Sequence, residues 1–463
     1  MNNWGVKYRL WTGLVIIGVY LLGSGWSHSA RSFGHPPGED SLVIGIIGDQ
    51  TGAHDLNKAY TTLEEATQQI KRHHPGVVIH VGDFVESAFG ISGYSEYLHD
   101  FNRGTRAMNS IGVPWFLTTG DHDVNPPGYH PLSPDHSREH WYQDLCDSIG
   151  LPVSQHLYYS FDVGNYHFIS LDALERFHTD PRWGSIFLNK LPDDQINWLK
   201  SDLESHANAT GIIVFLHHPQ WYVWSNWSSV HNLLRQYPVI AVIAGHFHYD
   251  QDDGLIDGIH YLVVGATGGD TMHGDANSGG TPEYGVMNLR GRAITGFTLY
   301  QVPSDSVLEF TPRVSTDRMQ ALRTMLSNLF EDRTLYLAYK GDIEKAAPEG
   351  GTVNVGIRYL ANPIDLPVHM AVTVSDGKSH QLNVPPVQFT AGERTDYANY
   401  SFSGFWKAPS VFWVGKSDLK SNSWMLQDSV DVTIKVTYTD TRKRWIRQEY
   451  KFRTKTISTT NSQ

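Results

Sequence analysis

The sequence has little cysteine and an excess of acidic over basic residues. Cys146 is the only cysteine among 463 residues, which excludes an intramolecular disulfide. Lys and Arg together number 36 against 48 Asp and Glu, giving a formal net charge of -12. Nucleic acid and anionic membranes bind proteins through clusters of positive charge. Because this chain is acidic, neither is expected as a main partner. Carboxylates attract metal ions, so the acidic composition is compatible with a metal site.

Long hydrophobic runs are also missing, apart from a short one near the N-terminus. Lys7 and Arg9 precede the apolar residues 10–22, and small residues follow up to Ala30. This order is typical of a secretory signal, and the run is shorter than the roughly 20 residues that a membrane-spanning helix needs. We predict that residues 1–30 are a signal peptide or an uncleaved signal anchor. The protein is then exported, periplasmic or extracellular, and the second alternative leaves it tethered to the membrane.

Short apolar runs alternate with helical patterns between residues 41 and 300. The continuous β-branched runs predict strands buried on both faces, and they lie at residues 41–47, 77–81, 114–118, 212–216 and 239–244. Amphipathic patterns predict helices at residues 56–73, 95–109 and 191–207. The turn Gly164-Asn165 predicts a hairpin over 156–172. Together these patterns indicate a layered domain of the α+β class over residues 41–300.

The C-terminal part has a different periodicity. Residues 316–330 carry apolar side chains on one helical face, within a helical connector that we place at 301–349. From Gly350 the period changes to two, and turn-rich segments separate the alternating stretches. We predict an immunoglobulin-like β-sandwich over residues 350–458. Its polar positions fit the outer faces of strands, so it is a candidate for glycan or protein contacts rather than for catalysis.

Metal-ligand side chains follow each of the five buried strands. They are Asp49, Asp83, Asp121 with His122 and Asp123, His217 with His218, and His246 with His248. Sites in layered α/β folds gather at the carboxyl ends of strands, and a preceding glycine lets the backbone turn sharply there. Carboxylate and imidazole ligands without thiolate suit Mn, Fe, Zn, Ni or Co. Asp83, at the centre of the set, could bridge two ions about 3.5–4 Å apart.

These blocks resemble the calcineurin-like metallophosphoesterases, whose pattern is D-x-H, G-D, G-N-H-[DE], H and G-H-x-H in that order. The resemblance covers about residues 42–300. It implies a four-layer α/β/β/α fold, in which helices flank a two-sheet sandwich, and two divalent or mixed-valence transition-metal ions. By the resemblance, Asp49, Asp83 and His248 would hold one ion. Asp83, Asp121, His217 and His246 would hold the other.

The resemblance also implies a catalytic histidine. His122 would protonate the leaving oxygen or stabilise charge on the phosphoryl group, with Asp123 orienting its ring. Within the family we disfavour the purple acid phosphatases, because Gly52 stands where we expect their tyrosine ligand. The aromatic residues Trp221 and Tyr222 are candidates for the wall of a substrate pocket.

Two positions depart from the family pattern. Thr51 replaces a histidine in the first block, so Gln50, Thr51 and His54 are candidates for an extra ligand or a pocket residue. Asp121 replaces asparagine, and a carboxylate there should bind a cation more tightly but lower its Lewis acidity. Gly268 and Gly269, after the last block, are candidates for close approach of the substrate.

The favoured hypothesis is an exported dinuclear metal-dependent phosphoesterase. It would hydrolyse small phosphomonoesters or phosphodiesters with a metal-bound hydroxide. The alternative is a catalytically weakened, metal-containing envelope binding protein that uses its β-sandwich for glycan or protein contacts.

Overall fold

The computed structural model describes most of the chain from residue 41 onward. The described residues are 31–33, 41–86, 93–125, 136–153, 155–174, 190–222, 226–271, 277, 279–332, 334–339, 352–357, 362, 364–375, 381–389, 412–418 and 429–460. The predicted signal segment, residues 1–30, lies outside them. Among the described residues, no helix combines the length and the apolar character needed to cross a membrane.

A six-stranded sheet carries the first three predicted strands. Its order is β13 (Val307–Leu308), β12 (Ala293–Gln301), β11 (Glu283–Arg290), β2 (Ser41–Ile47), β3 (Val77–His80) and β4 (Trp115–Leu117). The strands β2, β3 and β4 run parallel, whereas β11 pairs antiparallel with β2. The carboxyl ends of β2, β3 and β4 therefore lie along one edge of this sheet.

A seven-stranded sheet packs against the first. Its order is β1 (Arg31–Phe33), β5 (Tyr159–Val163), β6 (Tyr166–Ser170), β7 (Gly211–Phe215), β8 (Val239–Ala244), β10 (Ile259–Val263) and β9 (Gln251–Ile256). β6, β7, β8 and β10 run parallel. Every residue of β7 and β8 is buried, as predicted from their uninterrupted apolar sequences.

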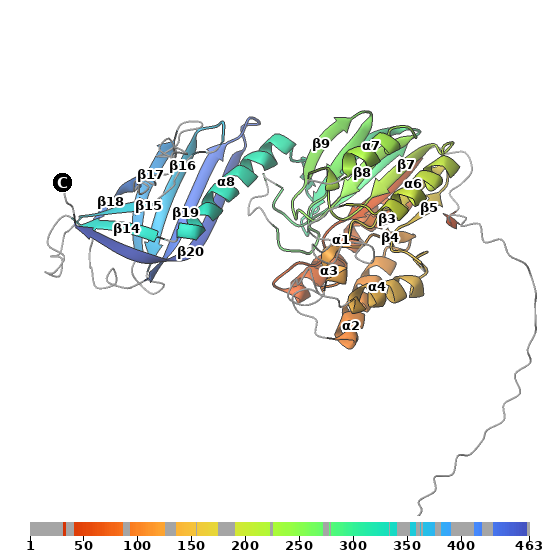
Figure 1. Ribbon diagram of the computed structural model, residues 1–463, viewed down its shortest axis with the longest axis horizontal. Helices are drawn as coiled ribbons and strands as arrows, with labels where there is room; N and C mark the ends of the chain where they lie inside the picture. The colour runs from red at the N-terminus through yellow and green to blue at the C-terminus, as the bar shows by residue number, and fades with distance from the viewer. Residues whose placement is uncertain are drawn as a thin grey trace, which may run out of the picture.

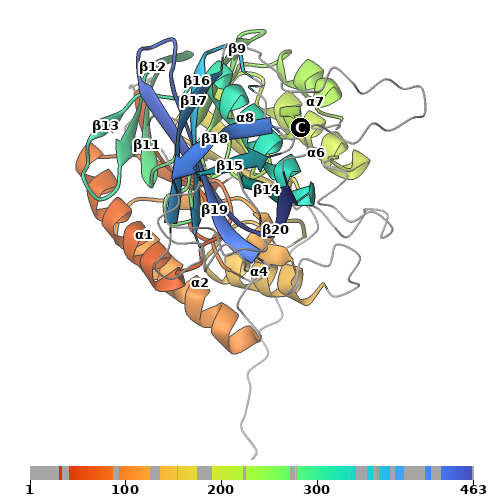
Figure 2. The same ribbon diagram turned by 90° about the vertical axis from the view of Figure 1, so that its left-hand side faces the viewer.

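Helices cover both outer faces of the two sheets. On one side lie α1 (Leu56–Ile70), extended by a 3₁₀ turn at Lys71–His73, and α2 (Tyr94–Asn109), with the short α3 (Asp121–Val124) and α4 (Ser137–Ser148). On the other lie α6 (Asp193–Ser205), α7 (Trp227–Leu234) and the 3₁₀ turn Gln220–Tyr222. Figures 1 and 2 show the two helical groups on opposite sides of the sheets.

Two apolar clusters hold these layers together. The larger combines the facing sides of both sheets with residues of α1 and α2, including Phe161, Phe168 and Phe215 between the sheets. The smaller joins the outer face of the seven-stranded sheet to α6 and α7 through residues such as Leu199 and Val230. The predicted four-layer α+β arrangement is thus confirmed. Cys146 is buried within the larger cluster.

A third sheet follows the long helix α8 (Arg313–Asp332). Its order is β17 (Gln381–Phe389), β16 (Val368–Ser375), β19 (Ser429–Thr439), β20 (Trp445–Thr460), β14 (Thr334–Tyr339), β15 (Thr352–Ile357) and β18 (Phe412–Asp418). β20 pairs with β19 along residues 445–455 and with β14 along 455–460, and the end strands β17 and β18 contact each other. The sheet therefore folds over on itself, which fits the predicted sandwich.

One strand of the third sheet lies earlier in the chain than the sequence indicated. β14 falls within residues 301–349, which the sequence analysis assigned to a helical connector, yet it pairs with β15 and β20. The predicted connector helix is present as α8. Figure 1 shows α8 running from the first two sheets along the third.

Candidate metal centre

The predicted ligands meet where the parallel strands of both sheets end. Asp49, Asp83 and Asp121 follow β2, β3 and β4, while His217 and His246 follow β7 and β8 of the other sheet. A hydrogen bond from the Gly245 N–H to the His217 carbonyl oxygen (3.0 Å) joins the loops after β7 and β8. The sandwich thus brings side chains that are up to about two hundred positions apart in the chain to one edge.

The backbone is strained at four of these positions. Asp49, Asp83, His246 and His248 have φ values of 33°, 59°, 69° and 54°, a left-handed region that residues other than glycine rarely adopt. Such conformations cost about 1–3 kcal/mol each and persist only where the surroundings enforce them. Strain at four ligand-type residues that converge on one edge indicates a functional site.

A first cluster contains Asp49, Asp83 and His217, whose ligand atoms lie within 4.8 Å of one another. All three side chains are fully buried. His217 Nδ1 donates to the Val81 carbonyl oxygen at 2.8 Å, which leaves Nε2 facing Asp83 Oδ1 at 3.3 Å. His248 joins the edge of this cluster, with Nε2 3.8 Å from Asp49 Oδ1.

A second cluster contains Asp121, His217, His218 and His246, again with ligand atoms within 4.8 Å of one another. Asp121 Oδ1 lies 3.0 Å from His217 Nε2, 3.1 Å from His246 Nδ1 and 3.7 Å from His218 Nε2. The resemblance placed His217 rather than His218 in the ligand set, but the structure brings both to Asp121. His217 belongs to both clusters.

The charges and unpaired atoms of these clusters fit a cation. Oδ2 of Asp49 and Oδ2 of Asp83 are buried and have no hydrogen-bond partner among the described residues. Burial alone would raise the pKa of Asp83, but the His217 imidazole lowers it to about 2. Burial raises the pKa of Asp49. Buried carboxylate oxygens that lack a hydrogen-bond donor and lie near imidazole nitrogens are a donor set suited to transition-metal ions.

Glu86 holds the ring of His122. Its two carboxylate oxygens lie 2.8 and 2.7 Å from His122 Nδ1, and both side chains are buried. Burial alone would lower the pKa of His122, but Asp83 and Glu86 raise it to about 10. Nε2 of His122 faces the Gly52 backbone, where an added Cβ would lie 3.3 Å from it.

The expected role of Asp123 is corrected by these contacts. Its carboxylate accepts backbone N–H groups of Asp83, Phe84, Val85 and Gly120 at 2.7–3.1 Å, so it shapes the loop after β3 instead of orienting His122. Sequence reasoning missed Glu86, although it lies only three positions after Asp83. The only signal in the sequence was an acidic residue three positions after a predicted ligand.

The three candidates for an extra ligand in the first block make other contacts. Thr51 Oγ donates to the Asp83 carbonyl oxygen (2.9 Å), and Gln50 Nε2 donates to that of Phe84 (3.0 Å). His54 is exposed and pairs with Asp270. Thr51 and Gln50 therefore tie the first loop to the second, and His54 lies on the rim.

Gly268 and Gly269 allow close approach of protein segments. A Cβ on Gly269 would lie 2.4 Å from the Thr51 carbonyl oxygen and 2.7 Å from His248 Cε1. A Cβ on Gly268 would lie 2.6 Å from the Gln50 carbonyl oxygen. In the structure these two glycines therefore allow segments of the site to approach each other closely.

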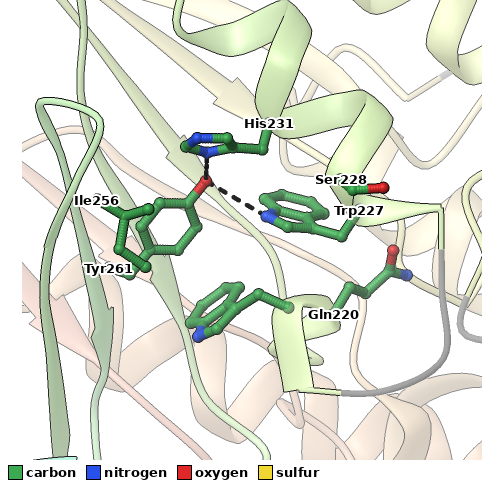
Figure 3. Close-up of a pocket in the computed structure, with 7 residues that line it drawn as sticks. Gln220, Trp227, Ser228, His231, Ile256 and Tyr261 are labelled. Carbon is green, nitrogen blue, oxygen red and sulfur yellow. Dashed lines mark hydrogen bonds between the residues drawn. The ribbon is translucent and has the colours of Figure 1, made fainter.

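Trp221 and Tyr222 make different contacts. Trp221 lines a cavity of about 320 Å³ together with Gln220, Trp227, Ser228, His231, Ile256 and Tyr261, and none of the predicted ligands lines it. In Figure 3 the Tyr261 hydroxyl is held by His231 and Trp227 inside this cavity. Tyr222 hydrogen-bonds to Asp253. Trp221 thus belongs to a separate pocket, whereas the Tyr222 ring lies 5.3 Å from that of Phe247, which stands between His246 and His248 in the chain.

The chain resembles known phosphatases over its first half. Residues 42–250 match the calcineurin-like phosphoesterase family. Purple acid phosphatase 23 of Arabidopsis thaliana is 28% identical over 153 residues, which cover 29% of this chain and 28% of that protein. Purple acid phosphatase 22 of the same plant is 26% identical over 151 residues, covering 29% and 30%. The match spans less than a third of the length of either relative.

Two solved structures are similar at low identity. A dimetal phosphatase from Danio rerio aligns with a TM-score of 0.39 and 15% identity, covering 55% of this chain and 98% of that one. Purple acid phosphatase PPD1 from yellow lupin (Lupinus luteus) seeds aligns with a TM-score of 0.42 and 14% identity, covering 61% and 56%.

The fold and the ligand clusters define a layered protein with a metal-binding edge. Residues 42–250 form a calcineurin-like phosphoesterase domain, as their match to the family shows. Both of these relatives are named as purple acid phosphatases, the subfamily that the sequence analysis disfavoured because of Gly52.

Proposed function

We propose that this protein is a metal-dependent phosphoric ester hydrolase. One observation carries the proposal: three buried carboxylates and several imidazoles from five strand ends converge on one edge, with two carboxylate oxygens left without partners. Asp49, Asp83 and His248 would hold one ion. Asp83, Asp121, His217 and His246 would hold a second. Bound ions would neutralise the negative charge of a phosphate ester and lower the pKa of water.

His122 would act on the leaving group. Its pKa of about 10 keeps the ring protonated at neutral pH, and the Glu86 carboxylate accepts the Nδ1 proton. Nε2 then carries the proton that a departing alkoxide needs, next to the ligand His248. Asp123 would contribute indirectly, because it fixes the loop that carries Asp83. The substrate class that fits is a small phosphomonoester or phosphodiester.

The parts of the chain outside the hydrolase domain would direct export and bind a partner. We propose that residues 1–30 direct export, that the hydrolase domain spans 41–300, and that 301–349 connect it to a C-terminal domain at 350–458. Support comes from the strand distribution, since the first two sheets use residues 31–308 and the third uses 334–460. The C-terminal domain would contact a glycan or a protein.

The test is hydrolysis of a chromogenic phosphate ester. The full-length protein would be freed of metal, reloaded with Mn²⁺ or Zn²⁺, and assayed on one monoester and one diester, alongside His122→Ala. We expect metal-dependent turnover that falls by about 10²–10⁴-fold in the variant, the usual contribution of a general acid. Metal binding without turnover in either protein would favour the alternative, an envelope binding protein.

A further inference from the structure

His218 is a buried imidazole without a hydrogen-bond partner. Nδ1 is buried and has no partner among the described residues, and Nε2 lies 3.7 Å from Asp121 Oδ1, beyond hydrogen-bond distance. The residue is only 5% exposed. Buried polar groups are nearly always paired, and an unpaired one calls for a physical explanation. A residue that merely filled space here would be apolar.

The surroundings of His218 are those of a metal ligand. Its Nε2 faces the same Asp121 oxygen that lies 3.0 Å from His217 Nε2 and 3.1 Å from His246 Nδ1. Atoms that bind one ion at about 2.0–2.2 Å can be at most about 4.4 Å apart. All three distances to the Asp121 oxygen fall within this limit, and all four ligand atoms lie within 4.8 Å of one another, an arrangement compatible with one shared ion.

The ring of His218 also packs on a predicted ligand. Its centroid lies 3.8 Å from that of His246, with the two planes inclined by 52°. The other half of the centre differs: Thr51, where the family pattern has a histidine, donates to a backbone carbonyl and supplies no imidazole. The chain thus has one imidazole fewer on the Asp49 side and one more on the Asp121 side.

We propose that His218 is an additional metal ligand through Nε2. Asp121, His217, His218 and His246 then supply three imidazoles and one carboxylate to this ion, in addition to Asp83. The site around Asp49 and Asp83 relies on fewer side chains, so the two ions bind unequally and the Asp121 site fills first. This inference rests on the metal centre of the proposed function.

The test compares metal uptake by two variants of the full-length protein. Metal-free wild type, His218→Ala and His218→Phe would be titrated with Co²⁺, following the heat of binding and the visible absorption of the bound ion. We expect stepwise binding in the wild type and a first-ion affinity at least about 10–100-fold weaker in both variants, with an altered Co²⁺ spectrum. His99→Ala, which removes an exposed histidine on α2, is the control and should match the wild type.

The outcomes separate ligation from packing and from the proposed function. Phenylalanine preserves a ring against His246 but cannot bind metal. Loss of affinity in the alanine variant alone would overturn the proposal, because His218 would then act by packing. Wild-type affinity and spectrum in both variants would overturn it as well. If the wild type binds no Co²⁺, Mn²⁺ or Zn²⁺, the proposed hydrolase itself fails. Circular dichroism of the metal-free variants establishes that they are folded.

Discussion

At the scale of single residues, the site leaves no room for a side chain at position 52, where the chain has Gly52. It has a φ of 75°, and an added Cβ would lie 2.7 Å from His248 Cε1 and 3.3 Å from His122 Nε2. We expect Gly52→Ala to displace both rings and lower kcat/KM by about 100-fold, the usual effect of misplacing catalytic groups by about 1 Å. Steady-state kinetics measure this change. Gly112→Ala is the matched control, since Gly112 has a φ of 83° but nothing within 4 Å of its added Cβ.

The contact between Glu86 and His122 sets the alkaline limit of activity. Asp83 and Glu86 raise the pKa of His122 to about 10 against the opposing effect of burial. The protonated ring is the active form, so activity should be lost as pH rises through the pKa of His122 in the metal-loaded protein, which bound cations at Asp83 lower. Glu86→Gln removes one negative charge, and the alkaline limb of the pH–rate profile should move to lower pH. Glu64→Gln, on the exposed side of α1, should leave the profile unchanged, and an unmoved limb in Glu86→Gln would contradict the role of Glu86.

The sequence predicted which side chains converge where a residue follows a strand directly. The sequence identified Asp49, Asp83 and Asp121 because strand ends of a layered fold must meet at one edge. It did not identify Glu86, because a contact made three residues into a loop depends on how that loop turns. It also chose His217 over His218, because both follow β7 and only the folded structure shows that both lie near Asp121 Oδ1.

At the scale of helices and strands, local patterns predicted the elements but not their neighbours. The apolar runs at 41–47 and 239–244 form strands with the predicted bounds, and the helix predicted at 95–109 begins one residue earlier. The order within each sheet could not be read from periodicity, since β2 pairs with β11 across more than two hundred residues. β14 could not be predicted from the local sequence either, because its partner β20 lies at the other end of the C-terminal region.

A buried histidine fastens α6 to the hairpin of β5 and β6, far from the metal-ligand edge. His167 Nδ1 lies 2.8 Å from Asp162 Oδ1 and Nε2 lies 2.8 Å from Asp202 Oδ2, so both nitrogens donate to carboxylates and the ring is an imidazolium. The His206 ring stacks on it at 3.6 Å. Burial alone would lower the pKa of His167, but the two carboxylates raise it above its ordinary value.

This arrangement predicts a fold that weakens in alkaline solution. A raised folded-state pKa stabilises the protein fully below the unfolded value of about 6.5 and loses this contribution as pH rises through the folded value. We expect His167→Gln to cost about 2 kcal/mol near pH 6, because two partly buried carboxylates then lose a charged hydrogen-bond donor, and less near pH 9. Urea unfolding at both pH values measures the difference. A cost that is equal at both would show that His167 is neutral when folded; His260→Gln is the control.

At the scale of the whole molecule, α8 and a few polar contacts join the third sheet to the first two. Arg442 lies 3.1 Å from both Glu309 Oε2 and the Phe310 carbonyl oxygen, and the Trp445 carbonyl oxygen accepts from Asn277 at 3.2 Å. Exposed pairs of this kind contribute little, because water and salt screen them. The apolar and buried contacts of α8 must therefore provide most of the coupling between the two halves.

Met319 is the position where this coupling can be tested. It lies on α8, is 1% exposed, and its sulfur is 3.1 Å from the Tyr438 hydroxyl of β19. Removing a buried methionine side chain costs about 2–5 kcal/mol, so Met319→Ala should loosen the third sheet from α8.

In calorimetry, metal should raise the unfolding temperature of the whole wild-type protein, because ligand binding stabilises every part that unfolds with the site. In Met319→Ala we expect the transition to split, with metal shifting only the part that holds the two metal-ligand clusters. Separate transitions already in the wild type would show that α8 is a linker and does not couple the two halves.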